Sequence, residues 1–142
     1  MELDPNADSW QLPIVGFEVI EIWFSGIVYV VAYGQGDPTR GIAAPNTKIG
    51  LGGAFVLRAA DGVEHRLDGS EPWSTLTPLL SLRHSEICSA CADRESVLRI
   101  EFSDGAVISA GPDPQYENWD LQGPDGLWLV APPGGGDPRI TH

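Results

Sequence analysis

The chain has 142 residues, a hydrophobic fraction of 42% and a formal net charge of −12 at pH 7, which describe one ordinary globular domain and exclude a disordered chain. A field of this sign repels nucleic acid and anionic membranes, and it favours encounter with a basic partner. The acidity comes from the terminal thirds, because neither residues 1–39 nor residues 100–138 contain Lys or Arg. Such acidity also keeps a protein soluble, so it does not by itself define a partner.

The first residues do not resemble an export signal. The sequence Met-Glu-Leu-Asp-Pro has neither a basic start nor an apolar stretch behind it. The longest apolar run, residues 26–33, is far too short to span a membrane. We therefore expect a cytoplasmic protein whose two cysteines, Cys88 and Cys91, are reduced.

The N-terminal half predicts strands. Residues 1–12 are expected to form a flexible acidic arm. Residues 17–24 are rich in Val, Ile, Trp and Phe and predict a strand, and residues 26–33, apolar on both faces, predict a central one. Residues 34–53 are dense in Gly, Pro, Asn and Thr and predict a loop, interrupted by a short strand near its end.

Three Asp-Gly pairs mark turns in the rest of the chain. Asp61-Gly62 lies between two apolar-patterned runs, which predicts a hairpin with a type I′ turn, and Asp104-Gly105 follows an alternating strand. Asp125-Gly126 precedes a further strand, and a short helix is expected at 77–84 because Thr77 can cap it. The predicted core comprises Val19, Ile22, Val28, Val30, Phe55, Leu57, Leu80, Leu98, Ile100 and Phe102.

A faint internal repeat suggests an ancient duplication. Residues 16–22, followed by an apolar strand, resemble residues 85–90, followed by the strand at 97–102. Each unit would be a pair of strands, and the helix would link the two units. Strands of similar polarity also imitate each other without common origin.

No motif indicates catalysis or a cofactor. Cys88-x-x-Cys91 follows the predicted helix and lies in or near a strand, whereas redox pairs begin a helix. Zinc needs four ligands, and His84 and His65 are the nearest additions, with no second Cys pair. Signatures of a nucleophile or of a phosphate-binding loop are absent. We therefore expect no enzyme activity, no metal and no cofactor, with both cysteines packed in the sheet.

The most distinctive segment is residues 113–126. It combines aromatic residues, which can anchor an interface, with carboxylates, which can steer a cationic partner. The competing interpretation is that the aromatic residues fold inward and close one end of the core. The candidate partner-binding residues are Asp113, Tyr116, Glu117, Trp119 and Asp120. Glu18 and Glu21 are expected on opposite faces of their strand, so at most one joins this surface.

Tyr116-Glu117-x-Trp119, Gly123-Pro124-x-Gly126 and the later Pro-Gly-Gly at 133–135 resemble a motif of small, acidic, uncharacterised, mostly actinobacterial proteins. The resemblance implies no established activity, although some similar proteins sit among toxin and immunity genes. That family usually closes with a short apolar strand ending in Trp, whereas Gly136-Asp137-Pro138-Arg139 stands here. The last strand is therefore in question.

These patterns predict an α+β fold, mainly antiparallel β, with two strand-rich halves linked by one short helix. One β-rich domain is expected at 13–131, followed by a disordered tail at 132–142. The expected function is a non-catalytic binding protein, specifically an immunity protein that neutralises a cationic toxin by occluding its surface, with no binding to nucleic acid or membrane. The alternatives are a small-ligand-binding or weakly enzymatic β domain, and a structural homodimer.

Overall fold

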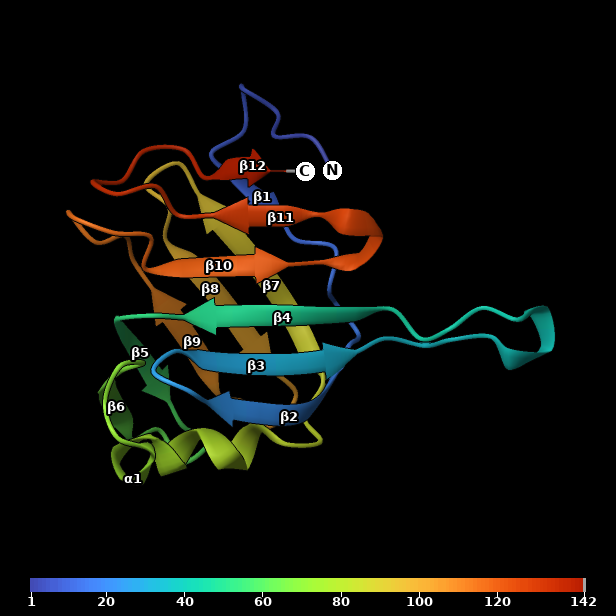
Figure 1. Cartoon of the computed structure of the whole chain (residues 1–142), viewed down its shortest axis with the longest axis horizontal. Coiled ribbons are helices and arrows are strands. Elements are labelled where there is room, and N and C mark those ends of the chain that lie inside the picture. The colour runs from blue at the N-terminus through green and yellow to red at the C-terminus, as the bar shows by residue number, and fades with distance from the viewer. Residues whose placement is uncertain (142) are drawn as a thin grey trace.

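The computed structural model describes residues 1–141 and shows two antiparallel sheets packed face to face (Figure 1). Sheet A contains, in spatial order, β1 (Ser9–Gln11), β7 (Ile87–Asp93), β8 (Leu98–Phe102), β9 (Val107–Ala110), β5 (Ala54–Arg58) and β6 (Glu64–Asp68). Sheet B contains β12 (Arg139–Thr141), β11 (Trp128–Val130), β10 (Trp119–Gln122), β4 (Asn46–Leu51), β3 (Val28–Tyr33) and β2 (Glu18–Phe24). The fold is therefore mainly antiparallel β, as predicted.

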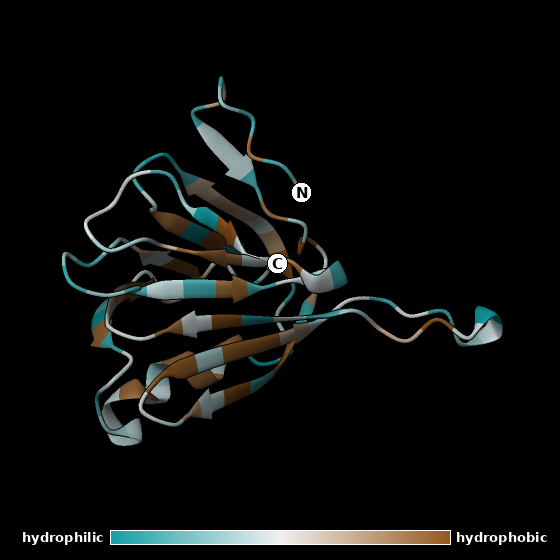
Figure 2. Ribbon diagram, turned by 45° about the horizontal axis from the view of Figure 1, so that its top comes forward, coloured by the Kyte–Doolittle hydropathy of each residue, from teal (hydrophilic) through white to brown (hydrophobic). Residues whose placement is uncertain are grey.

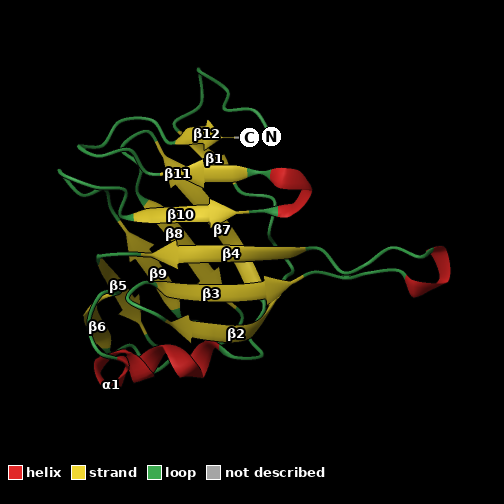
Figure 3. Ribbon diagram, in the orientation of Figure 1, coloured by secondary structure: helices red, strands yellow, loops and turns green. Residues whose placement is uncertain are grey.

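The helical content is small and lies at the edges of the molecule (Figure 3). Helix α1 (Trp73–Leu76) continues into the 3-10 helix η2 (Thr77–Leu82), and together they connect β6 to β7. Two further 3-10 turns, η1 (Pro38–Arg40) and η3 (Pro124–Gly126), lie in connections of sheet B. No helix within residues 1–141 is long and apolar enough to cross a membrane.

The core lies between the sheets, where side chains of alternating residues meet. Of the predicted core, Ile22 is only partly buried, and Leu80 is wrong because it is 46% exposed. Its neighbours Leu79 and Leu82 are buried instead, since the tighter 3-10 geometry points residue 80 outward. Figure 2 shows the hydrophobic residues along the strands and the hydrophilic tip of the long β3–β4 connection.

The connectivity of the chain repeats. The meander β2-β3-β4 is followed by the hairpin β5-β6, and the meander β7-β8-β9 is followed by the hairpin β10-β11. Each hairpin crosses to the other sheet, where its first strand pairs with the last strand of the other meander. The strands that open the meanders even carry bulges at matching places, Val19/Glu21 and Ile87/Ser89. The two similar segments of the sequence thus occupy equivalent positions, although each sheet mixes strands from both units.

One connection breaks this repeat. The β8–β9 connection is the tight turn at Asp104-Gly105, whereas the equivalent β3–β4 connection is a long hairpin extension, residues 34–45, that projects from the molecule (Figure 1). We call this extension the arm. Its two sides are joined by backbone hydrogen bonds between Asp37 and Ile42, both 2.9 Å. The strand that was expected near residues 48–51 is the full strand β4, in the middle of sheet B.

Both termini are docked rather than loose. Residues 1–12 were expected to be flexible, but they contain β1, whose Trp10 is 6% exposed. Residues 132–142 were expected to be disordered, but they contain β12, which pairs with β11. Arg94 holds both ends: Nε donates to Ala7 O at 2.7 Å, and Nη1 lies 3.2 Å from Asp137 Oδ2. Trp10 and Ile140 supply the apolar contacts that a tail needs to order. The packed domain therefore extends beyond 13–131, and residue 142 lies outside the described residues.

The three Asp-Gly turns adopt two geometries. Only Asp125 has the positive φ, 60°, that a type I′ turn needs at its first central residue. At the other two turns Gly62 and Gly105 have positive φ, but Asp61 and Asp104 do not. The hairpin at Asp61-Gly62 is confirmed, but its type I′ geometry is wrong.

Candidate functional site

The distinctive segment at 113–126 is divided between the core and the surface. Trp119, in β10, points into the core at 1% exposed, and its Nε1 donates to Ser96 O at 2.8 Å. A partner cannot contact this indole, so Trp119 is removed from the candidate interface. Asp120 follows it in the strand and therefore points to the opposite, outer face of sheet B.

The other three candidates lie in the connection between β9 and β10. Asp113 Oδ1 accepts a hydrogen bond from Gln115 N at 2.9 Å, and Tyr116 is 44% exposed. Partial burial, followed by the charge of Asp113, a hydrogen bond to its carboxylate and the charge of Asp68, raises the pKa of Tyr116. Glu117 is exposed. Asp113, Tyr116 and Glu117 therefore lie on a surface loop. The buried Trp119 separates this loop from Asp120.

Asn118 anchors this loop to sheet A. The residue is 4% exposed, and its Nδ2 donates to both Ala54 O and Gly111 O at 2.8 Å. Its Oδ1 has no hydrogen-bond partner within the described residues. Two carbonyl acceptors fix the orientation of the amide, so the loop has a defined structure at its C-terminal end.

A second group of side chains, which the sequence did not reveal, lies on the outer face of sheet B. Strand register places Trp23, Tyr29, Gly50 and Asp120 in one row across four strands. A neighbouring row contains Glu21, Val31, Lys48, Gln122 and Trp128. We call these two rows the aromatic face. Figure 1 looks onto this face and shows no helix or strand in front of it.

Trp23 is the centre of one side of the aromatic face. The Trp23 and Tyr29 rings meet edge to face at 6.1 Å, and Lys48 Nζ lies 4.7 Å from the Trp23 ring centroid. The indole Nε1 donates to Glu21 Oε2 at 2.6 Å. Trp23 nevertheless remains 40% exposed, so these contacts orient a ring that still presents a surface to solvent.

Asp120 and Trp128 form the other side. Trp128 is 43% exposed, and its Nε1 donates to Asp120 Oδ2 at 3.0 Å. Asp120 Oδ1 lies over Gly50, where a side chain on residue 50 would collide with it. Burial raises the pKa of Asp120, and hydrogen bonds from Trp128 and Gln122 partly oppose that rise. The result is a half-buried carboxylate next to the exposed indole of Trp128.

The bulge in β2 changes the placement of two carboxylates. Glu18 and Glu21 were expected on opposite faces of the strand. The extra residue at the Val19/Glu21 bulge shifts the alternation by one, so both side chains lie on the outer face. Glu18 Oε2 lies 3.2 Å from His84 Nδ1. Both carboxylates therefore add negative charge to the same side of the molecule.

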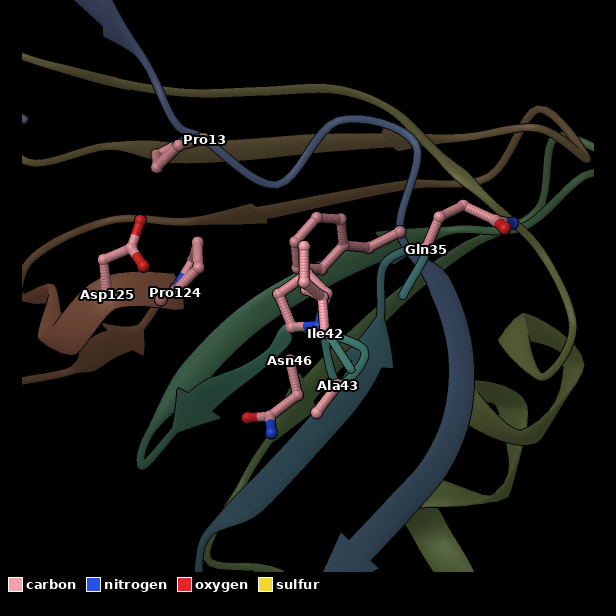
Figure 4. Close-up of a pocket in the computed structure, with 10 residues that line it drawn as sticks. Pro13, Gln35, Ile42, Ala43, Asn46, Pro124 and Asp125 are labelled. Atoms are coloured by element: carbon pink, nitrogen blue, oxygen red, sulfur yellow. The ribbon is translucent and has the colours of Figure 1, made fainter. Parts of the chain in front are cut away.

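A pocket opens at the base of the arm, at the end of sheet B (Figure 4). It has a volume of about 760 Å³. Figure 4 shows Pro124 and Asp125 on one side, and Ile42, Ala43 and Asn46 on the other. The remaining lining residues are Pro13, Phe17, Gln35, Pro45 and Gly123.

The side chains considered for metal or thiol chemistry do not form a site within residues 1–141. No group of three or more His, Cys, Asp or Glu side chains within residues 1–141 is arranged to hold a metal ion. Cys88 is exposed at the β7 bulge, and Cys91 points from the outer face of sheet A. Burial raises the pKa of Cys91, which disfavours its thiolate.

The fold and the aromatic face together define a two-sheet β domain with an exposed aromatic surface on sheet B. The chain belongs to the family of unknown function DUF6188, whose match spans residues 10–137. The expectation of an uncharacterised family is thereby confirmed. No curated protein and no solved structure matches this chain.

Proposed function

We propose that this protein is a non-catalytic binding protein of the cytoplasm that covers the surface of a basic protein partner, as an immunity protein covers a toxin. The aromatic face is its contact surface. The observation that carries the proposal is the pair of exposed indoles, Trp23 and Trp128, on an uncovered sheet face around the half-buried carboxylate of Asp120.

Aromatic residues on such a face suit protein recognition. Trp and Tyr are enriched at the energetic centres of interfaces, because each buries a large rigid area at a low cost in side-chain entropy. Trp23 and Trp128 lie on β2 and β11, which three strands of sheet B separate. At about 4.8 Å per strand, the two indoles are roughly 19 Å apart across the sheet, a span that fits a protein surface of ordinary interface size.

Charge supports a basic partner. Strands β2, β3, β10 and β11 of sheet B come from the terminal thirds that contain no Lys or Arg. Lys48, the cation in the two rows of the aromatic face, already makes a cation–π contact with the Trp23 ring. Asp120, by contrast, has no cationic partner within the described residues, and a half-buried carboxylate of this kind binds Arg or Lys more strongly than an exposed one does.

The test is affinity capture from the native host followed by work on the purified partner. Wild type is compared with the double variant Trp23→Ala/Trp128→Ala and with Trp73→Ala, which removes another exposed indole, 67% exposed, from helix α1. We expect a basic protein to be captured by wild type and Trp73→Ala and lost with the double variant. The purified partner should form a complex of defined stoichiometry and lose its own activity in it.

Other results would replace the proposal. A partner that is retained by the double variant would move the interface elsewhere. A co-purifying small molecule would favour a ligand-binding β domain. A dimer that dissociates when both indoles are removed, measured by sedimentation, would favour a structural homodimer.

A further inference from the structure

The three Asp-Gly turns differ in whether the Asp carboxylate accepts a hydrogen bond from its own turn. Asp61 Oδ1 accepts from Val63 N, and Asp104 Oδ1 accepts from Ala106 N, both at 2.9 Å. These two carboxylates stabilise their own turns. The carboxylate of Asp125 makes no hydrogen bond or ion pair with any residue from 1 to 141, and it lines the pocket at the base of the arm.

The pocket provides an apolar wall beside this carboxylate. Phe17 and Ile42, together with three prolines, give it apolar surface, and Gln35 and Asn46 supply amide groups. None of its lining residues is Lys, Arg or His. A site with one carboxylate, amide oxygens and a hydrophobic wall matches a group that has an apolar stem and a positively charged head.

The pocket also lies where the repeat of the fold is broken. One wall is the arm, and the equivalent connection in the other unit is the tight turn at Asp104-Gly105, which is too short to form such a wall. The repeated framework therefore does not account for the pocket. Its remaining walls come from the terminal thirds without Lys or Arg, at residues 13–17 and 123–125.

We propose that this pocket binds an arginine side chain presented by an extended segment of the partner. This rests on the proposed function and adds the chemistry of one contact. The guanidinium pairs with the Asp125 carboxylate, and the methylene stem packs on the wall of Phe17 and the prolines. The arm, which projects next to the pocket, guides the segment that carries the arginine.

The probe is acetyl-arginine amide, titrated into the ¹⁵N-labelled protein and followed by amide chemical shifts. Acetyl-citrulline amide, which has nearly the same shape without the charge, is the matched ligand. We expect saturable shifts at Asn46, Gly123 and Asp125 with the arginine probe and much smaller ones with citrulline. Shifts spread evenly over the acidic surface, or an equal response to both probes, would overturn the proposal.

Two variants test whether the Asp125 carboxylate itself binds the arginine probe. Asp125→Asn keeps the shape and tolerates the positive φ, and we expect it to weaken the arginine probe about threefold, as for an exposed ion pair. Asp61→Asn makes the same change in net charge at another Asp-Gly turn and should leave binding unaltered. Equal weakening by both variants would indicate only the general negative field.

This experiment is independent of the test of the proposed function. Trp23→Ala/Trp128→Ala lies outside the pocket and should not alter binding of the arginine probe. Loss of the partner by the double variant, together with unaltered binding of the probe, would support both. Absence of probe binding with retained partner capture would reject only the arginine pocket.

Discussion

The outer faces of the two sheets are built on the same backbone plan and carry opposite chemistry. The register places five residues of sheet A in the row that corresponds to the first row of the aromatic face: Cys91, Arg99, Ser109, Val56 and Arg66. In sheet B the corresponding row is Trp23, Tyr29, Gly50, Asp120 and Val130.

Sheet A shows what the fold needs on an outer face. Its charges neutralise one another, with Arg99 Nη2 at 3.0 Å from Glu101 Oε1 and Arg66 Nη2 at 3.9 Å from Glu64 Oε1. Such pairs are exposed and contribute little to stability. Because a polar face suffices in sheet A, the exposed indoles of sheet B are not explained by folding, and exposed aromatic residues carry a cost in solubility.

The largest effect on stability is expected for a substitution in the core between the sheets, because both outer faces depend on that core. Ile100 is fully buried, and Ile100→Asp should destabilise the protein by several kcal/mol, on the order of its total stability, because it buries an unpaired charge. Arg99→Asp, one residue away on the outer face, should cost less than about 1 kcal/mol. Thermal and urea unfolding give both values. A normal melting temperature for Ile100→Asp would mean that the strand assignment is wrong.

The next effect separates the two faces directly. Trp23→Ala should weaken binding of the purified partner by about 30-fold or more, the effect of an interface hot spot of 2 kcal/mol. Cys91→Ala, at the equivalent place in sheet A, should leave affinity unaltered. Calorimetric titration measures both, and melting curves check that each variant is folded. If Cys91→Ala weakened binding as much, the comparison of the faces would fail.

A smaller effect concerns the stability of the aromatic face. The pKa of Asp120 is raised by burial, so the native state binds its proton more tightly than the unfolded state does. Its contribution to stability therefore falls as pH rises through the interval between the unfolded and native pKa values. Asp120→Asn should stabilise the protein at pH 7 relative to wild type, by less than about 1 kcal/mol, and this gain should shrink at pH 3.

The control for that measurement is Asp61→Asn, which removes the same charge from an exposed turn of sheet A. Every Asp→Asn change in a protein with a net charge of −12 relieves some repulsion. Urea unfolding at the two pH values therefore compares the two variants. A gain for Asp61→Asn as large as that for Asp120→Asn would assign the effect to net charge alone.

The sequence revealed local features and missed the assembly of strands. Alternation predicted the strand around Ile100, and Asp-Gly predicted the hairpins, because neighbours in the chain determine both. The sequence grouped Trp119 and Asp120 because they are neighbours in a segment of aromatic residues and carboxylates, and it did not predict strand β10, in which successive side chains point to opposite faces. The row from Trp23 to Asp120 joins residues far apart in the chain, and only strand pairing brings them together. The bulge that places Glu21 beside Glu18 likewise has no clear sequence signal.

The smallest expected effect tests where the carboxylates act on the partner. Asp113 and Glu117 lie on the β9–β10 loop, whereas Asp120 lies on the aromatic face. If that face is the contact, Asp113→Asn/Glu117→Gln should slow association a few-fold and flatten its salt dependence, because exposed charges steer encounter and are screened within about 10 Å at 0.1 M salt. Dissociation should be unaltered for this pair of substitutions, since neither carboxylate is covered in the complex.

Asp120→Asn should instead accelerate dissociation, because it weakens a contact that the complex buries. Stopped-flow association and dissociation rates for the purified partner, measured across a salt series, distinguish the two. Faster dissociation of the loop variant with unaltered dissociation of Asp120→Asn would transfer the contact surface from sheet B to the loop, and the exposed indoles would then need another explanation.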